Sequence, residues 1–225
     1  FGGSLMRPEA TGYGAVFFCE EMLERRGLSL EGLRVGVSGS GNVAQHAIEK
    51  AMQLGAKVVT VSDSSGFVLD PDGFTPDKLA ELMDVKNHHY GRVGDYAKRV
   101  KAEFCPGQRP WNVPMDVALP CATQNELTED DARVLVANGV QCVAEGANMP
   151  STLQAIEVFE DSRVPYAPGK ASNAGGVATS GLEMSQNAMR LVWDSREVED
   201  RLRSIMRGIH QTCVDHGKRP DDSVN

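Results

Sequence analysis

The residues with the clearest chemical potential are those of the turn Gly39-Ser40-Gly41-Asn42-Val43-Ala44, which has the pattern G-x-G-x-x-A. Gly39 permits a tight turn from strand to helix, and Gly41 has no Cβ, so that a pyrophosphate can approach the backbone. Ala44 is small enough for the helix to pack on the strand, and the free N–H groups at the helix start can bind phosphates. We predict a dinucleotide site here; the alternative is a tight turn without a ligand.

The elements on either side of this turn fit that prediction. Val35 and Val37 indicate a short buried strand, and a helix is expected from Asn42 to Leu54, ending at Gly55. A second strand, Lys57–Ser62, leads to Asp63. The spacing matches the acidic partner of a dinucleotide turn, which follows the turn by about 20 residues.

Small and amide-bearing residues follow each predicted strand. The segments are S-G-S-G-N at 38–42, S-D-S-S-G at 62–66, C-A-T-Q-N-E at 121–126, E-G-A-N-M-P at 145–150 and K-A-S-N-A-G-G at 170–176. In a doubly wound parallel sheet such loops line one crevice outside the carboxyl ends of the strands. Ordinary turns and helix caps favour the same residues and are the alternative.

Periodicity and turn residues predict the remaining elements. Helices are expected at Met6–Arg26 with Pro8 at N1, at Thr75–Asn87 capped by Thr75, after Thr128, and at Ser151–Glu160 capped by Ser151. Further strands are expected at 67–69, 115–119, 141–144 and 164–167, with 103–114 irregular. The pattern predicts an α/β fold, a doubly wound Rossmann-like parallel sheet with flanking helices and a C-terminal helical segment.

Two features of the predicted helices concern packing. Gly12 and Gly14 interrupt the first helix, so that either close packing on the sheet or the approach of a ligand or second domain is expected there. The apolar residues of the C-terminal helical segment are expected to lie mostly in the core: Leu182, Met184, Met189, Leu191, Val192, Leu202, Ile205, Met206 and Ile209.

Composition excludes several classes of function. A net charge of −8 disfavours binding to nucleic acid and to anionic membranes. The chain has no apolar run near the ~20 residues that span a bilayer, and no secretory signal at its start. The 5 cysteines lack C-x-x-C spacing, which predicts reduced thiols in a cytoplasmic protein. His88 and His89 are expected to point apart, so we predict no metal site.

Several long motifs resemble glutamate dehydrogenase, most closely the bacterial NADP-dependent hexameric type. They are Gly2-Gly3-Ser4, R-P-E-A-T-G-Y-G at 7–14, the segments 38–44, 120–127 and 144–150, and 170–187 with N-A-G-G-V-A-T-S-G-L-E-M-S-Q-N. The resemblance covers residues 1–225 but only the family's coenzyme-binding domain. It implies that the N-terminal substrate domain and the last C-terminal helix are absent, and that this fragment binds coenzyme without turnover.

The resemblance also implies roles for individual residues. Thr11 and Asn42 match cofactor contacts, and Val177 and Ser180 match positions that face the substrate. Asp63, Ser64 and Lys86 match positions around the adenosine 2′-phosphate. The positions along the nicotinamide half are matched by Thr123, Gln124, Asn148 and Asn173. No catalytic residue is expected in this chain, because the family's catalytic lysine and aspartate belong to the absent domain; Lys170 is expected at the pocket edge.

The coenzyme preference rests on two opposed arguments. Asp63 favours NAD, because a carboxylate accepts a hydrogen bond from a ribose 2′-hydroxyl and repels a 2′-phosphate. The resemblance favours NADP, which fits if Ser64 donates to the phosphate, Lys86 neutralises it, and Asp63 turns away or pairs with Lys86 or Arg92. We predict NADP, with NAD as the alternative.

The resemblance implies the reversible oxidative deamination of L-glutamate to 2-oxoglutarate and ammonia. A branched-chain or aromatic amino-acid dehydrogenase is one alternative, because substrate selection depends largely on the absent domain. A non-catalytic nucleotide-binding module is another. The family is hexameric, so a homohexamer is expected for the full-length protein and a monomer or weak dimer for the fragment.

Overall fold

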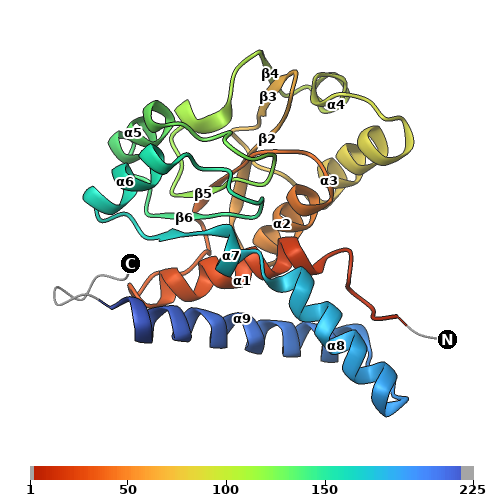
Figure 1. Ribbon diagram of the computed structural model, residues 1–225. Helices are drawn as coiled ribbons and strands as arrows, with labels where there is room; N and C mark the ends of the chain where they lie inside the picture. Colours follow the sequence, from red (N-terminus) through yellow and green to blue (C-terminus); the bar gives the residue numbers. More distant parts are fainter. Residues whose placement is uncertain (1–2, 219–225) are drawn as a thin grey trace.

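A seven-stranded sheet forms the centre of the molecule in the computed structural model, with strands in the order β4-β3-β2-β1-β5-β6-β7 (Figure 1). The structure describes residues 3–218, so Gly2 of the first motif and Pro220 near the end lie outside the described residues. The strands are β1 (Arg34–Val37), β2 (Lys57–Asp63), β3 (Gly66–Leu69), β4 (Glu103–Pro106), β5 (Val117–Leu119), β6 (Cys142–Ala144) and β7 (Tyr166–Ala167).

Helices surround this sheet. The first half of the chain contributes α1 (Ala10–Glu24), α2 (Asn42–Gln53), α3 (Pro76–Met83), the π-helical turn η1 (Asp84–His88), α4 (Val93–Val100) and the 3-10 turn η2 (Pro110–Asn112). The second half contributes α5 (Glu129–Ala137), α6 (Leu153–Asp161), α7 (Gly169–Ser172), α8 (Gly175–Met189) and α9 (Ser195–Gly217).

The sheet is doubly wound about β1, as predicted. β1 pairs in parallel with β2 on one side and with β5 on the other, and β6 and β7 continue the parallel order. The winding direction therefore reverses between β1 and β5, where ligands bind in folds of this class. At one edge β3 and β4 extend this parallel sheet as antiparallel strands, a detail that the sequence prediction did not include. β4 lies in the segment predicted to be irregular.

Two apolar clusters cover the two faces of the sheet, because successive side chains of a strand point to opposite sides. Val117 and Leu119 of β5 belong to the cluster that includes α1 and α2. Ala118, between them, belongs to the cluster with Leu135 of α5 and Phe159 of α6. The sheet is thus buried on both faces, as its continuous β-branched strands require.

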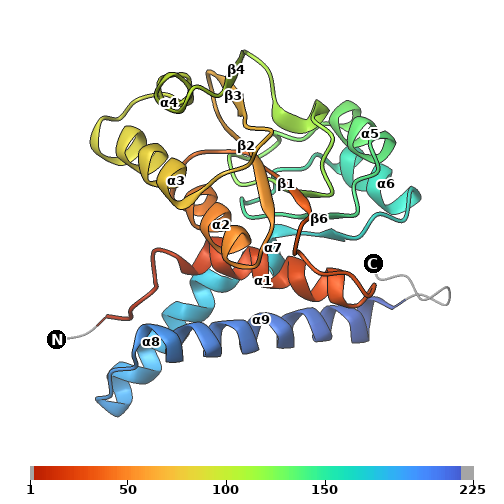
Figure 2. The same ribbon diagram turned by 180° about the vertical axis from the view of Figure 1, so that it is seen from behind.

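Helix α1 is buried along most of its length because other elements cover it on several sides (Figure 2). It packs against β6, α2, α8 and α9. A Cβ on Gly12 would lie 2.6 Å from Ala47 N and Val43 O of α2, and one on Gly14 would lie 2.8 Å from Gly175 Cα. Close packing is therefore the reason for both glycines, although their partners are helices and not the sheet.

Several predicted boundaries were wrong. α1 begins at Ala10 with Glu9 as its N-cap, so Pro8 precedes the helix and is not at N1. The cap of α6 is Thr152, whose hydroxyl accepts from Ala155 N, because Ser151 instead pairs with Leu127 in a β-bridge. The last strand is confined to Tyr166–Ala167. The predicted caps at Thr75 and Thr128 are confirmed.

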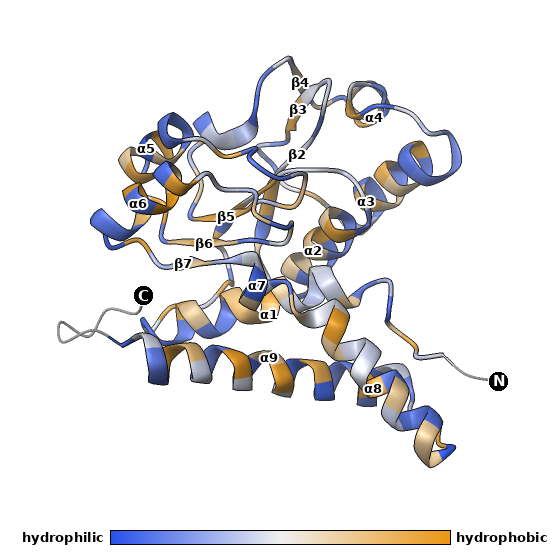
Figure 3. Cartoon of the chain, viewed as in Figure 1, coloured by the Kyte–Doolittle hydropathy of each residue, from blue (hydrophilic) through white to orange (hydrophobic). Residues whose placement is uncertain are grey.

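The C-terminal helices differ in burial. Leu202 and Met206 of α9 are buried, as predicted, but Met184 is 73% exposed and Val192 is 86% exposed. Met189 and Leu191 are exposed as well, so the predicted core positions of α8 and the following connection were wrong. The reason is that α8 projects away from the sheet and carries apolar residues with it (Figure 3).

All five cysteines are free thiols in this structure. Cys19 of α1 and Cys142 of β6 are buried with their sulfur atoms 3.6 Å apart. Over residues 3–218, no helix has the length and apolar character needed to cross a membrane.

The close approach of α1 to α2 yields a testable expectation. Gly12→Ala should lower the free energy of unfolding by about 1–3 kcal/mol, because its methyl group would overlap backbone atoms that cannot move independently. Gly208→Ala is the matched control: its Cβ would meet nothing within 4 Å, and the exchange should raise helix stability by up to ~1 kcal/mol. Urea denaturation measures both, and an unchanged G12A variant would contradict the packing described.

Candidate functional site

The loops that follow β2, β1, β5, β6 and β7 lie side by side at the carboxyl edge of the sheet. Gly39 N donates to Ser62 Oγ at 2.8 Å, which joins the β1 and β2 loops. Cys121 N donates to Ser38 Oγ at 2.9 Å, and Gly146 N donates to Pro120 O at 2.9 Å. The segments predicted to share one edge do share it, and these hydrogen bonds fix their spacing.

The glycine turn leaves the start of α2 open. Gly39 has φ +80°, and a Cβ there would lie 2.8 Å from Cys121 O, so only glycine fits. A Cβ on Gly41 would meet nothing within 4 Å, and Gly41, as N-cap of α2, has no side chain to bond the first N–H groups. Those N–H groups point along the axis of a helix of 12 residues and fit the diphosphate of a dinucleotide.

Asp63 ends β2 and is held by several donors. Its Oδ1 accepts from Ser65 N and Oγ, and its Oδ2 accepts from Val93 N at 3.0 Å and from Lys86 Nζ at 3.2 Å. Burial alone would raise its pKa, but the hydrogen bonds from Ser65, Val93 and Lys86 outweigh that effect and lower it. Asp63 therefore pairs with Lys86, which is one of the arrangements predicted from the sequence.

Ser64 lies beside this pair and is exposed. Its hydroxyl accepts from Arg92 Nη1 at 2.9 Å. Arg92 was considered in the sequence only as a partner for Asp63, and the structure brings it to Ser64 instead. Lys86, Arg92 and the Ser64 hydroxyl together provide two cations and a hydroxyl at one corner of the edge, a donor set suited to a phosphate monoester.

The histidines of the next connection were predicted to point apart, and that prediction was wrong. His88 Nδ1 and His89 Nε2 each lie 3.2 Å from a different carboxylate oxygen of Asp84, because the π-helical turn brings both rings to one residue. Within residues 3–218, no group of three or more His, Cys, Asp or Glu side chains is arranged to hold a metal ion.

The loop after β5 is anchored by Glu126, a residue that the sequence did not single out. Ser38 Oγ donates to Glu126 Oε1 at 2.7 Å and Ala122 N donates to the same oxygen at 3.0 Å. Burial raises the pKa of Glu126 although these donors act against the shift. Thr123 and Gln124 lie exposed on the loop that this carboxyl group holds.

Cys121 begins the same loop and is buried. Burial raises the pKa of its thiol, and the neighbouring Glu126 charge acts in the same direction. A Cβ on Gly146 would lie 2.5 Å from its sulfur, so the thiol fills the space between two loops. This environment suits an inert packing residue rather than a reactive thiol.

Two amide side chains meet on the loops that follow β6 and β7. Asn173 Nδ2 donates to Asn148 Oδ1 at 2.8 Å and is 3.2 Å from Ala147 O. Lys170, on the short helix α7, is exposed. The predicted site residues Asn148 and Asn173 are thus brought together, and Lys170 lies on the surface.

The start of α8 brings a further group of predicted residues together. A Cβ on Gly176 would lie 2.5 Å from Thr11 Oγ1, which places Thr11 of α1 against α8. Ser180 Oγ accepts from Arg7 Nε at 3.0 Å, whereas Val177 is 73% exposed. Arg7 was not among the predicted site residues; its place in the R-P-E-A-T-G-Y-G segment was the available signal.

The side chain of Asn42, like those of Asp63, Lys86 and Asn173, is engaged by the protein itself. Its Nδ2 donates to Pro8 O at 2.6 Å, so it ties the start of α2 to the segment before α1. Ser40 is buried and its carbonyl accepts from Gln45 Nε2 at 2.8 Å, whereas Val43 lies half-buried beside Gly146. The ligand roles of these residues remain predictions.

Comparison with known proteins gives consistent matches. A model of the family Glutamate/Leucine/Phenylalanine/Valine dehydrogenase matches residues 2–224. The NADP-specific glutamate dehydrogenase of Salmonella typhimurium is 64% identical over 217 residues, which are 96% of this chain and 48% of the relative. The NAD(P)-specific glutamate dehydrogenase of Xylanibacter ruminicola is 57% identical over 225 residues, 100% of this chain and 51% of the relative.

Solved structures agree with this match. Plasmodium falciparum glutamate dehydrogenase 2 superposes with a TM-score of 0.95 at 47% identity, covering 96% of this chain and 48% of that one. A hetero-hexameric glutamate dehydrogenase from Thermus thermophilus, in a leucine-bound form, superposes with a TM-score of 0.81 at 27% identity, covering 96% and 48%. The chain spans about half the length of the curated relatives it matches.

The environment of Asp63 makes a prediction about stability and pH. A carboxyl group with a lowered pKa in the folded state stabilises the fold above its unfolded pKa, which is about 4, and loses that contribution as the pH falls through the folded pKa. Asp63→Asn should therefore lower the free energy of unfolding at pH 7 by about 1–3 kcal/mol, with a difference that shrinks below pH ~4. Denaturant unfolding over this pH range measures it.

Asp200→Asn, at an exposed position of α9, removes the same charge and is the control. Its unfolding free energy should follow that of the unmodified chain. Equal stabilities of the D63N variant and the unmodified chain at pH 7 would contradict the described network.

Proposed function

The chain belongs to the Glutamate/Leucine/Phenylalanine/Valine dehydrogenase family, and on that premise we propose that it forms the coenzyme-binding half of an NADP-dependent glutamate dehydrogenase. The observation that carries the proposal is the open start of α2 behind Gly39 and Gly41, with Lys86, Arg92 and Ser64 at the end of the neighbouring strand. We propose that residues 1–225 form one dinucleotide-binding domain.

The corner formed by Ser64, Lys86 and Arg92 is proposed to hold the adenosine 2′-phosphate. Asp63 would repel that phosphate if its charge were unpaired, but Lys86 Nζ lies 3.2 Å from its Oδ2 and Val93 N donates to the same oxygen. Because the carboxylate is bonded within the protein, Ser64 and Arg92 remain to face the ligand. The name of the Xylanibacter relative includes both coenzymes, so NAD remains the alternative.

The rest of the coenzyme would extend along the carboxyl edge of the sheet, from β2 toward β7. The diphosphate would bind Gly39, Ser40, Gly41, Asn42 and Val43, with Thr11 beside them, and the nicotinamide half would lie along Thr123, Gln124, Asn148 and Asn173. When bound, the coenzyme supplies a hydride acceptor or donor. The protein's part is to orient this group and to exclude water around it.

The proposed reaction is the reversible oxidative deamination of L-glutamate to 2-oxoglutarate and ammonia. Ser180 and Val177 of α8 would form one wall of the substrate pocket, and Arg7 joins them because its guanidinium lies 3.0 Å from Ser180 Oγ. A guanidinium beside a hydroxyl suits a substrate carboxylate. No residue of this chain is proposed to transfer a proton to the substrate.

Two other functions remain to be separated from this one. One is a branched-chain or aromatic amino-acid dehydrogenase, since the family's description also names leucine, phenylalanine and valine dehydrogenases. A non-catalytic nucleotide-binding module would bind coenzyme and turn over nothing. The full-length protein is proposed to be a cytoplasmic homohexamer, and this chain alone a monomer or weak dimer. The hetero-hexameric Thermus structure is a precedent for six subunits but not for identical ones.

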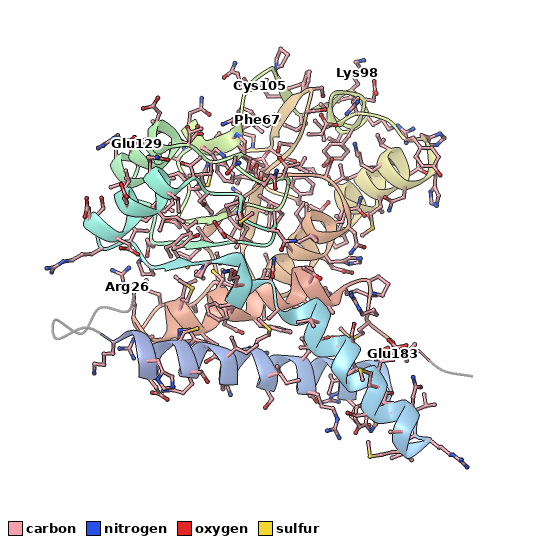
Figure 4. All side chains as sticks on the ribbon, viewed as in Figure 1. Arg26, Phe67, Lys98, Cys105, Glu129 and Glu183 are labelled. Carbon is pink, nitrogen blue, oxygen red and sulfur yellow. The ribbon has the colours of Figure 1, made fainter. Side chains whose placement is uncertain are left out.

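Calorimetric titration with NADPH and with NADH tests the coenzyme assignment. The unmodified chain should prefer NADPH, and Lys86→Ala and Arg92→Ala should each weaken NADPH binding about ten- to a hundredfold while changing NADH binding little. Lys98→Ala is the control, since Lys98 projects from α4 with an 80% exposed side chain (Figure 4). A preference for NADH, or equal losses for both coenzymes, would show that the phosphate corner is misassigned.

Restoring the other half of the polypeptide tests the reaction. The chain joined to the half of the Salmonella relative that it does not match should reduce NADP when L-glutamate is present, with weaker or no response to valine, leucine and phenylalanine. The chain alone should give no turnover. A joined protein that binds NADPH but converts none of these amino acids would support the non-catalytic module instead.

A further inference from the structure

Glu145 stands out among the buried polar residues because it follows β6 directly and is only 2% exposed. Its Oε1 accepts from Tyr166 Oη at 2.8 Å and from Ser151 N at 3.2 Å, and its Oε2 accepts from Gly169 N at 2.8 Å. These donors are two backbone N–H groups and one phenol. A single carboxylate therefore holds the two ends of the β6 loop and the start of the β7 loop.

The main chain of Glu145 reinforces the same junction. Its N–H donates to Ala167 O at 3.1 Å, and its carbonyl accepts from Ser172 Oγ at 2.7 Å. Ser172 immediately precedes Asn173, and Gly146 and Ala147 separate Glu145 from Asn148. The residue thus lies directly behind the two amide side chains that meet at the surface.

The position of these loops in the fold gives that junction a role. In a doubly wound sheet the acidic residue after the second strand marks the adenosine ribose, and the dinucleotide crosses the switch point to the other half of the sheet. Asp63 marks the first half here, so the loops after β6 and β7 lie under the nicotinamide half. Displacement of Asn148 and Asn173 would therefore affect one end of the coenzyme only.

We propose that Glu145 is a positioning residue that acts through Asn148 and Asn173 and sets the contacts of the nicotinamide half of the coenzyme, without touching it. This inference rests on the proposed function. Both oxygens of the carboxyl group accept from backbone N–H groups, so the junction needs two acceptors at this position. Burial and the neighbouring Glu145 charge raise the pKa of Tyr166, which keeps the phenol protonated as a donor.

Glu145→Gln is the sharpest variant. A glutamine amide has one accepting oxygen and one donating nitrogen, so in either orientation its NH₂ group faces the N–H of Ser151 or of Gly169. Water has little access to relieve this clash, because Glu145 is buried. The β6 and β7 loops must then separate, although the side-chain volume is almost unchanged.

The test compares two ligands by calorimetry. Adenosine 2′,5′-bisphosphate contains only the adenosine end and should bind E145Q within about twofold of the unmodified chain. NADPH should bind E145Q about tenfold more weakly, and its nicotinamide fluorescence on binding should change less than with the unmodified chain. Glu157→Gln, exposed on α6, removes the same charge and should alter neither ligand.

The possible outcomes distinguish failure of the positioning role from failure of the proposed function. A folded E145Q variant that binds both ligands normally, or loses both equally, overturns the positioning role and leaves the proposed function standing. An unmodified chain that binds neither ligand overturns the proposed function and this inference together.

If circular dichroism shows that E145Q does not fold, Tyr166→Phe replaces it in the same test. This substitution removes one hydrogen-bond donor to Glu145 and leaves both backbone donors in place. This variant should weaken NADPH binding about threefold and leave the bisphosphate unchanged. Equal effects on the two ligands, or none, would overturn the inference.

Discussion

The structure depends on one tight turn, the passage from β1 into α2 through Gly39. At this point the backbone has φ +80° and lies so close to the β5 loop that a Cβ would be 2.8 Å from Cys121 O. The turn folds α2 back onto one face of the sheet and brings its first N–H groups to the carboxyl edge. Ser38 and Ser62 then bond the neighbouring loops to it, and Gly12 lets α1 pack on the helix that it starts.

The carboxyl edge of the sheet, which this turn helps to form, differs in the charge that its two ends offer to a ligand. At the β2 end, Arg92 is exposed beside Ser64, and the partly buried Lys86 neutralises Asp63, so positive charge is available to a ligand. At the β5–β7 end, Glu126 and Glu145 are turned inward and accept hydrogen bonds from the loops themselves. Buried carboxylates shape loops that offer neutral amides, which suits a ligand with a phosphorylated end and an uncharged carboxamide end.

The sequence predicted the fold class and the loops at the edge because both follow from local patterns: β-branched strands, the glycine turn, and threonine caps such as Thr128. The sequence predictions were wrong where a contact with a residue far along the chain determines the local structure. Ser151 has the residue type of a cap but pairs with Leu127 across the sheet edge, and Met184 has helical spacing on a helix that leaves the core. Glu145, Arg7 and Arg92 were missed as site residues for the same reason, because their partners lie far along the chain or on another element.

A crystal structure of this chain with NADPH would test the central claim most directly. We expect the diphosphate on the N–H groups of α2 beside Gly41, the 2′-phosphate between Ser64, Lys86 and Arg92, and the nicotinamide over Asn148 and Asn173. A coenzyme bound in the reverse direction, or away from the carboxyl edge of the sheet, would contradict it.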